Sequence, residues 1–164
     1  MSAPWTIESL QPKIEGFLRP LLRTARLSLE FEVGDGSGID PGFEQPDVTV
    51  RFQGRDIDLL LANKGELLLA LEHVTLEMLR ARPEDHSKLM FDAEDYRMLR
   101  IEELRLSAET AAEKVKRTGA PFRFNPMTSR ERRIIHLALR GDTSVRTESE
   151  GLPPRRQVVI YPAK

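Results

Sequence analysis

The spacing of apolar residues changes repeatedly along this chain, and that alternation restricts it to a mixed α/β fold. Helical spacing comes first, at Ile7, Leu10, Ile14, Phe17, Leu18 and Leu21. Apolar residues then occupy every second position from Leu27 to Val33, which is the pattern of a half-buried strand. A second strand is predicted near residues 48–52, after a loop over residues 34–46 that is rich in Gly, Asp and Pro.

Two helices are predicted in the middle of the chain, on either side of the segment Ala62-Asn63-Lys64-Gly65. The first is short and begins near Asp56, and the second has an apolar stripe at Leu67, Leu71, Val74 and Met78. A strand at residues 88–91 and a long helix from about residue 93 to 118 follow. Basic residues in the last turn and Gly119 directly after it favour the end of that helix.

The last third of the chain is predicted to form a strand (121–124), a helix (129–140) and two strands (144–149 and 157–161). Thr128 and Glu131 have the spacing of a capping box, in which each side chain bonds the backbone of the other residue. Gly141 is expected to end the helix. The chain therefore has enough elements for two small α/β modules.

Composition and charge exclude several classes of function. The chain has 25 basic and 26 acidic residues, but residues 119–164 hold nine basic against four acidic ones, so positive charge is concentrated there. The absence of Cys excludes disulfides and thiolate chemistry. No apolar run reaches the ~20 residues needed to span a membrane, and the N-terminus lacks a signal-peptide pattern. We therefore expect a cytoplasmic protein whose last third could bind phosphates.

The helix at 129–140 carries the main candidate site. On a helical wheel, Arg132, Arg133, His136 and Arg140 fall within an arc of roughly 100°. A guanidinium can donate two hydrogen bonds to one phosphate and can also stack on a base. From spacing alone, a solvated basic face on an ordinary amphipathic helix explains the pattern equally well.

The segment Arg130-Glu131-Arg132-Arg133-Ile134-Ile135-His136, followed by Thr147-Glu148-Ser149-Glu150-Gly151 and Val158-Val159-Ile160, resembles the R-three-H domain of the bacterial Jag family. The resemblance covers about 45 residues, and Arg132 and His136 supply its defining pair. It implies a single-stranded nucleic-acid-binding domain at residues 119–164, acting on RNA in the bacterial cytoplasm. Arg156 also matches a family arginine, whereas Gln157 stands where a second one is frequent.

Residues 27–118 are similar in element order to the type II KH domain that precedes the R-three-H domain in Jag proteins, and residues 1–26 would form a separate N-terminal helix. KH domains clamp nucleotides with a Gly-x-x-Gly loop between two helices. Here that loop is Ala62-Asn63-Lys64-Gly65, so only the second glycine is present. The resemblance implies a KH fold with a weakened grip at Asn63, Lys64 and Gly65, or a KH fold that has lost RNA binding.

No residue pattern indicates catalysis. His73 and His86 lack a partner motif, and the acidic residues Asp92, Glu94 and Asp95 are well placed for helix capping. We expect no catalytic residue, metal or cofactor. The leading hypothesis is a non-catalytic protein that binds single-stranded RNA through Arg132, Arg133, His136, Arg140, Arg146 and Arg156, with single-stranded DNA left open. The alternative is a scaffold whose KH part docks another protein, such as a second KH domain.

Overall fold

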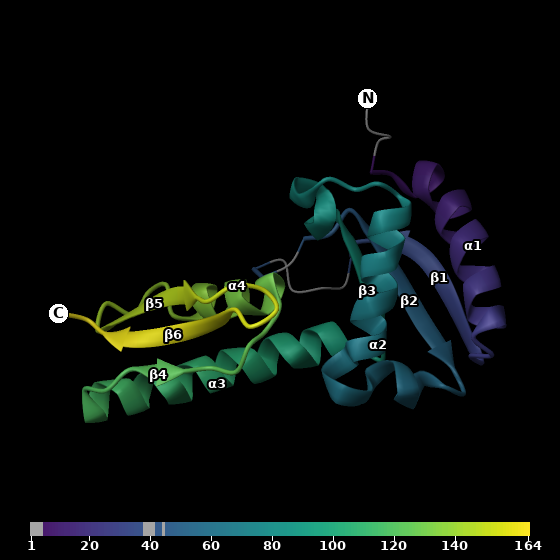
Figure 1. Cartoon of the computed structure of the whole chain (residues 1–164). Helices are drawn as coiled ribbons and strands as arrows, with labels where there is room; N and C mark the ends of the chain where they lie inside the picture. The colour runs from purple at the N-terminus through teal and green to yellow at the C-terminus, as the bar shows by residue number, and fades with distance from the viewer. Residues whose placement is uncertain (1–4, 38–41, 44) are drawn as a thin grey trace. The chain divides into compact units, whose positions relative to one another are not determined.

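The computed structural model describes residues 5–37, 42–43 and 45–164, and it divides into two compact units, residues 1–97 and 98–164 (Figure 1). Part of the predicted loop over residues 34–46 lies outside the described residues. Both units combine helices with a small three-stranded sheet, which confirms the predicted α/β class. In the described residues, no helix is both long enough and apolar enough to cross a membrane.

The first unit contains two long helices, a short 3-10 helix and a mixed sheet. Its elements are α1 (Ile7–Thr24), β1 (Leu29–Asp35), β2 (Val48–Gly54), α2 (Ile57–Met78), η1 (Pro83–Lys88) and β3 (Leu89–Ala93). The strand order is β1-β2-β3; β1 pairs antiparallel with β2, whereas β3 pairs parallel with it. A parallel pair needs a crossover connection, and α2 supplies it.

The core of the first unit lies between its sheet and the helices α1 and α2, which lie along the sheet in Figure 1. Alternate residues of β2, namely Val48, Val50 and Phe52, are buried in this core. The ring of Phe52 contacts Phe31 and Phe91 on the two neighbouring strands, with centroids 5.8 and 5.3 Å apart. The sheet is therefore joined across all three strands by aromatic packing.

The helix α2 is interrupted where the sequence predicts a break. Asn63, Lys64 and Gly65 all have left-handed backbone angles, with φ of 53°, 59° and 71°. The hydroxyl of Tyr96 donates to the carbonyl oxygen of Lys64 at 2.5 Å, and a Cβ on Gly65 would lie 3.0 Å from the Tyr96 ring. Glycine is therefore required at position 65 by both the backbone angle and the close ring.

A buried ion pair satisfies the free edge of β3. The Glu72 carboxylate accepts from the Phe91 backbone N–H at 2.8 Å and from the Arg97 guanidinium at 2.7 Å. Arg97 Nε in turn donates to the Phe91 carbonyl oxygen at 2.8 Å. Two charged side chains thus replace the neighbouring strand that Phe91 lacks on this side.

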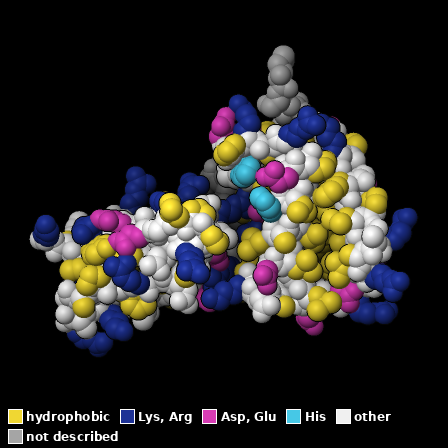
Figure 2. All heavy atoms as spheres, in the orientation of Figure 1, with side chains coloured by type: hydrophobic (Ala, Val, Ile, Leu, Met, Phe, Trp, Pro, Cys, Tyr) yellow, Lys and Arg dark blue, Asp and Glu magenta, His cyan; other side chains and the backbone are white. Residues whose placement is uncertain are grey.

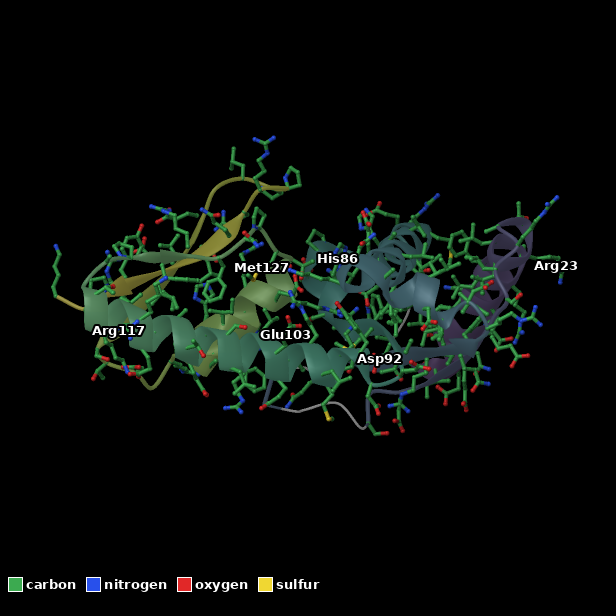
Figure 3. The ribbon with its side chains drawn as sticks, turned by 90° about the horizontal axis from the view of Figure 1, so that it is seen from below. Arg23, His86, Asp92, Glu103, Arg117 and Met127 are labelled. Carbon is green, nitrogen blue, oxygen red and sulfur yellow. The ribbon has the colours of Figure 1, made fainter. Side chains whose placement is uncertain are left out.

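The second unit contains α3 (Tyr96–Thr118), β4 (Phe122–Arg123), α4 (Ser129–Ala138), β5 (Val145–Glu150) and β6 (Gln157–Pro162), although the first two residues of α3 fall in the first unit. Figure 3 labels Glu103 and Arg117 along α3. The three strands form an antiparallel sheet in the order β4-β6-β5. The buried residues of α3 are Ile101, Leu104, Ala108, Ala111, Ala112 and Val115.

Candidate nucleic-acid interface

Reciprocal hydrogen bonds fix the start of α4, and this confirms the predicted capping box. The Thr128 hydroxyl accepts from the Glu131 backbone N–H, and the Glu131 carboxylate accepts from the Thr128 backbone N–H at 2.9 Å. The same carboxylate pairs with Arg100 of α3 at 2.8 Å. Local sequence and one tertiary contact therefore fix the first turn of α4. Arg132 and His136 follow on this helix, one turn apart.

The end of α4 differs from the prediction. The helix ends at Ala138 with Leu139 as its C-cap, so Arg140 lies in the following turn instead of in the last helical turn. Its N–H bonds to the Leu137 carbonyl oxygen at 3.3 Å, which is a tighter turn than the α-helical pattern. Arg140 is exposed, but the helical-wheel argument that grouped it with His136 does not apply.

His136 is half-buried and lies against β5, so it does not project freely into solvent. Its Nδ1 lies 2.6 Å from the Thr147 hydroxyl oxygen, and its Nε2 lies 2.9 Å from the Ser149 hydroxyl oxygen. Thr147 and Ser149 are two residues apart on β5, so they share the face of the sheet that α4 covers. Both ring nitrogens are therefore already paired with hydroxyl groups.

The surroundings of His136 keep its ring neutral near pH 7. Burial and the nearby charge of Arg132 both lower the pKa of His136 below its ordinary value of 6.5. In a neutral ring, one nitrogen donates and the other accepts. His136 therefore contributes an oriented polar surface at neutral pH, and the positive charge of the site comes from arginines.

The backbone of Met127, labelled in Figure 3, connects Arg132 to Arg156. The Arg132 guanidinium donates to the Met127 carbonyl oxygen at 2.9 Å, while the Met127 N–H donates to the Arg156 carbonyl oxygen at 3.1 Å. The Arg156 guanidinium contacts the Gly151 carbonyl oxygen at 3.3 Å. Partial burial and the nearby Arg156 charge lower the pKa of Arg132, so the two guanidiniums act on each other.

Among the described residues, no carboxylate neutralises these arginines. Each of the eight acidic residues of the second unit pairs with a basic residue outside the group Arg132, Arg133, Arg140 and Arg156, and none of these four forms an ion pair within the part of the chain that the structure describes. On the face of this unit that Figure 2 shows, basic side chains (dark blue) outnumber acidic ones (magenta). Positive charges that lie close together without counter-ions favour the binding of an anion from solution.

Arg146 lies apart from this group. It is on β5 between Thr147 and Val145, and successive strand residues face opposite sides of a sheet, so it points away from His136. Its guanidinium lies 4.3 Å from the centre of the Tyr161 ring and pairs with Glu148. The structure thus brings Arg132, His136 and Arg156 together, leaves Arg133 and Arg140 exposed on or just after α4, and places Arg146 on the other face.

The remaining predicted residues, Asn63, Lys64 and Gly65, belong to the first unit. Asn63 and Lys64 are exposed and Gly65 is buried beneath Tyr96. Sequence reasoning missed Tyr96, as well as Thr147 and Ser149. A signal for the two hydroxyls existed, because the alternation in β5 separates Thr147 and Ser149 from the charged residues Arg146 and Glu148.

The pKa of His136 predicts how stability depends on pH. Because the pKa of His136 in the folded chain lies below 6.5, the unfolded chain binds this proton more readily. The contribution of His136 to the free energy of unfolding is therefore fully present above pH 6.5 and falls as the pH drops below it. We expect urea unfolding midpoints of the wild type to fall between pH 7 and 5 more than those of His136→Gln, whose side chain does not titrate. Parallel pH profiles for the two proteins would contradict this prediction.

Comparisons with known proteins find one domain family within the second unit and relatives that match most of the chain. Residues 102–162 match the family model of the R-three-H domain. The RNA-binding protein KhpB of Clostridium symbiosum is 31% identical over 153 residues, which cover 93% of this chain and 66% of that protein. KhpB of Bacillus subtilis (strain 168) is 36% identical over 116 residues, covering 68% of this chain and 56% of the relative. KhpB of Lactiplantibacillus plantarum is 31% identical over 134 residues, which cover 82% of this chain and 42% of that protein. The chain thus spans less than two thirds of each relative.

Proposed function

Because the chain contains an R-three-H domain and is similar over most of its length to proteins named RNA-binding protein KhpB, we propose that it binds single-stranded RNA and catalyses no reaction. The observation that carries the proposal is the pair of residues Arg132 and Arg156, which the Met127 backbone joins by two hydrogen bonds and whose guanidiniums have no carboxylate partner in the described residues. Such an arrangement is repulsive when empty and becomes favourable when a phosphate lies between the charges.

The proposal assigns different roles to the predicted site residues. Arg132 and Arg156 hold the phosphate nearest His136, while Arg133 and Arg140 contact phosphates further along the strand. Arg146, which pairs with Glu148 on the opposite face of the sheet, contributes less than the other arginines. His136 is neutral at pH 7 and therefore contacts a sugar or base instead of a phosphate.

The salt dependence of binding tests this function. We expect the full chain to bind a fluorescently labelled single-stranded RNA, with anisotropy titrations giving an affinity that falls as salt rises. Each neutralised phosphate contributes about −0.7 to the slope of log K against log salt. A slope near zero, or the absence of binding at low salt, would refute phosphate recognition by this unit.

We propose in addition that residues 27–118 include a KH-like module, since the break in α2 lies where a KH loop would be. Three consecutive left-handed residues turn the chain there, and exposed Lys64 lies within the turn. The first glycine of the KH pattern is replaced by Ala62, however, and Tyr96 packs on Gly65. This loop is therefore expected to bind RNA more weakly than the arginines of the second unit do.

A protein-docking role for the first unit is the second candidate function. Two apolar residues of α2, Leu59 and Val74, are 58% and 40% exposed, and Figure 2 shows hydrophobic side chains gathered on this unit. A second KH-domain protein is one partner that such a surface could accept.

The double change Ala62→Gly with Asn63→Arg discriminates between the two roles of the first unit. It restores the missing glycine and adds a guanidinium, at a cost of about 1 kcal/mol for Arg in a left-handed conformation. We expect RNA affinity to rise about three- to tenfold if the loop contacts RNA, because one charge-assisted contact is gained. Unchanged affinity in anisotropy titrations, with a thermal melt showing that the variant is folded, would favour docking.

A further inference from the structure

We propose that His136, Thr147 and Ser149 together recognise the 2′-hydroxyl of a ribose, so that the second unit prefers RNA to single-stranded DNA. The inference rests on the proposed function and adds the sugar that this site selects. Its starting point is the hydrogen-bonding pattern of the three side chains, in which both imidazole nitrogens are within bonding distance of a hydroxyl, at 2.6 and 2.9 Å.

Counting donors and acceptors shows what this trio can offer a ligand. A neutral imidazole has one N–H donor and one acceptor nitrogen. One of the two hydroxyls therefore donates to the ring, and the other accepts from it. The hydroxyl that donates keeps lone pairs for a further donor, and the hydroxyl that accepts keeps its own O–H for a further acceptor. The trio therefore presents one O–H donor and at least one acceptor lone pair beyond its internal bonds.

Each of these free functions suits a 2′-hydroxyl, which is itself both a donor and an acceptor and can pair with either hydroxyl of the trio. A phosphate oxygen is only an acceptor and could pair with the free O–H alone. The neighbouring guanidiniums of Arg132 and Arg156 are better partners for phosphate, since each carries a full charge and several donors. Neutral hydroxyl groups next to guanidiniums therefore complement a nucleotide, in which a ribose hydroxyl lies next to a phosphate.

The three side chains are also accessible and held in place. His136, Thr147 and Ser149 are each partly exposed. The two hydroxyls are two residues apart on β5, which separates their Cα atoms by about 7 Å. Backbone pairing of β5 with β6 fixes that strand, as Thr147 pairs with Ile160 and Ser149 with Val158. Little ordering of the protein is therefore required when a sugar binds.

The test compares oligonucleotides that differ only at the sugar. Full-length protein is titrated with single-stranded RNA, with DNA of the same sequence that contains uracil, and with 2′-O-methyl RNA, which lacks the donor. We expect the wild type to bind RNA about three- to tenfold more tightly than DNA, since one hydrogen bond is at stake. The double variant Thr147→Val with Ser149→Ala should bring RNA affinity down toward that for DNA.

Three further variants separate recognition from folding. Thr147→Ser keeps the hydroxyl and should retain the RNA preference, whereas the single change Thr147→Val should reduce it. Thr143→Val removes an exposed hydroxyl from the loop before β5 and should leave the ratio unchanged. Melting temperatures confirm that each variant is folded.

The outcomes are distinguishable. If the wild type binds RNA and DNA within twofold, or if the folded double variant keeps the full RNA preference, ribose recognition by this trio is wrong while RNA binding stands. If the double variant loses affinity for RNA and DNA equally, the hydroxyls support the fold of the site and do not read the sugar. If the wild type binds neither oligonucleotide, the proposed function and this inference fail together.

Discussion

Replacing Arg132 and Arg156 by Gln should lower the affinity for single-stranded RNA by about 10- to 100-fold at ~0.1 M salt and reduce the salt slope by about 1.4. The slope change follows from two lost phosphate contacts of about 0.7 each. The two guanidiniums are within range of each other, and burial and Arg156 both lower the pKa of Arg132. Their removal therefore relieves repulsion in the free protein while it removes attraction for the ligand.

This combination makes the prediction specific. Removing two arginines that stabilise the fold would destabilise the protein. Here the substitutions remove the hydrogen bond from Arg132 to the Met127 carbonyl oxygen, but the free protein should otherwise keep or gain stability. The measurement is an anisotropy titration at four salt concentrations, together with a thermal melt of each variant.

Arg105→Gln provides the matched control. Arg105 is on α3, also in the second unit, and its guanidinium is paired with Glu102 and Glu109 at 2.6 Å each. Its removal takes away the same formal charge but no unpaired guanidinium, so the salt slope should stay close to that of the wild type. Equal losses in Arg105→Gln and in either single Arg→Gln variant would show that binding depends on net charge alone.

Replacing Arg97 by Met should destabilise the first unit by about 3–5 kcal/mol. The substitution preserves most of the side-chain volume but leaves the Glu72 carboxylate without its guanidinium, and both side chains are only 10% exposed. It also removes the donor to the Phe91 carbonyl oxygen at the edge of β3. Leaving a buried charge unpaired costs more than forming the pair contributes, so the loss should be large.

Fluorescence of Trp5 reports this transition. Trp5 is the single tryptophan of the chain, and it packs against the core of the first unit, so urea unfolding followed at this residue reports that unit. Arg19→Met is the control, because the Arg19–Glu15 pair is exposed and solvent screens it. Equal midpoint shifts for Arg97→Met and Arg19→Met would contradict the role assigned to the buried pair.

The elements themselves could be predicted because they depend on neighbouring residues. The capping box of α4 joins Thr128 to Glu131, three residues away, and the spacing alone was sufficient to identify it. The break in α2 was equally visible, since the sequence predicts that the first helical segment stops near Ala62–Gly65, and Gly65 tolerates the left-handed angle that it adopts at the end of the break. Comparison with known proteins then confirmed the R-three-H domain that the resemblance around Arg132 and His136 implied.

Patterns that depend on distant residues were predicted less well. The sequence predicts the apolar stripe of α2 at Leu67, Leu71, Val74 and Met78. Leu71 is buried, but Val74 is 40% exposed, and the other buried apolar residues of this helical segment are Leu68 and Leu76. Glu72 lies on this buried face, where a carboxylate is unexpected. It is accommodated because Arg97, 25 residues later, supplies its counter-charge.

By itself, the sequence determined the order of helices and strands, the capped helix and the pair of residues that define the R-three-H domain, because turns, caps and i,i+4 spacing are short-range properties. Only the tertiary structure decided what those residues can do. Packing of α4 on the face of β5 that carries Thr147 and Ser149 turned His136 toward these hydroxyls and left Arg146 on the uncovered face. Ion pairing elsewhere left Arg132 and Arg156 without counter-ions among the residues that the structure describes. These outcomes depend on contacts between segments far apart in the chain, which no local pattern encodes.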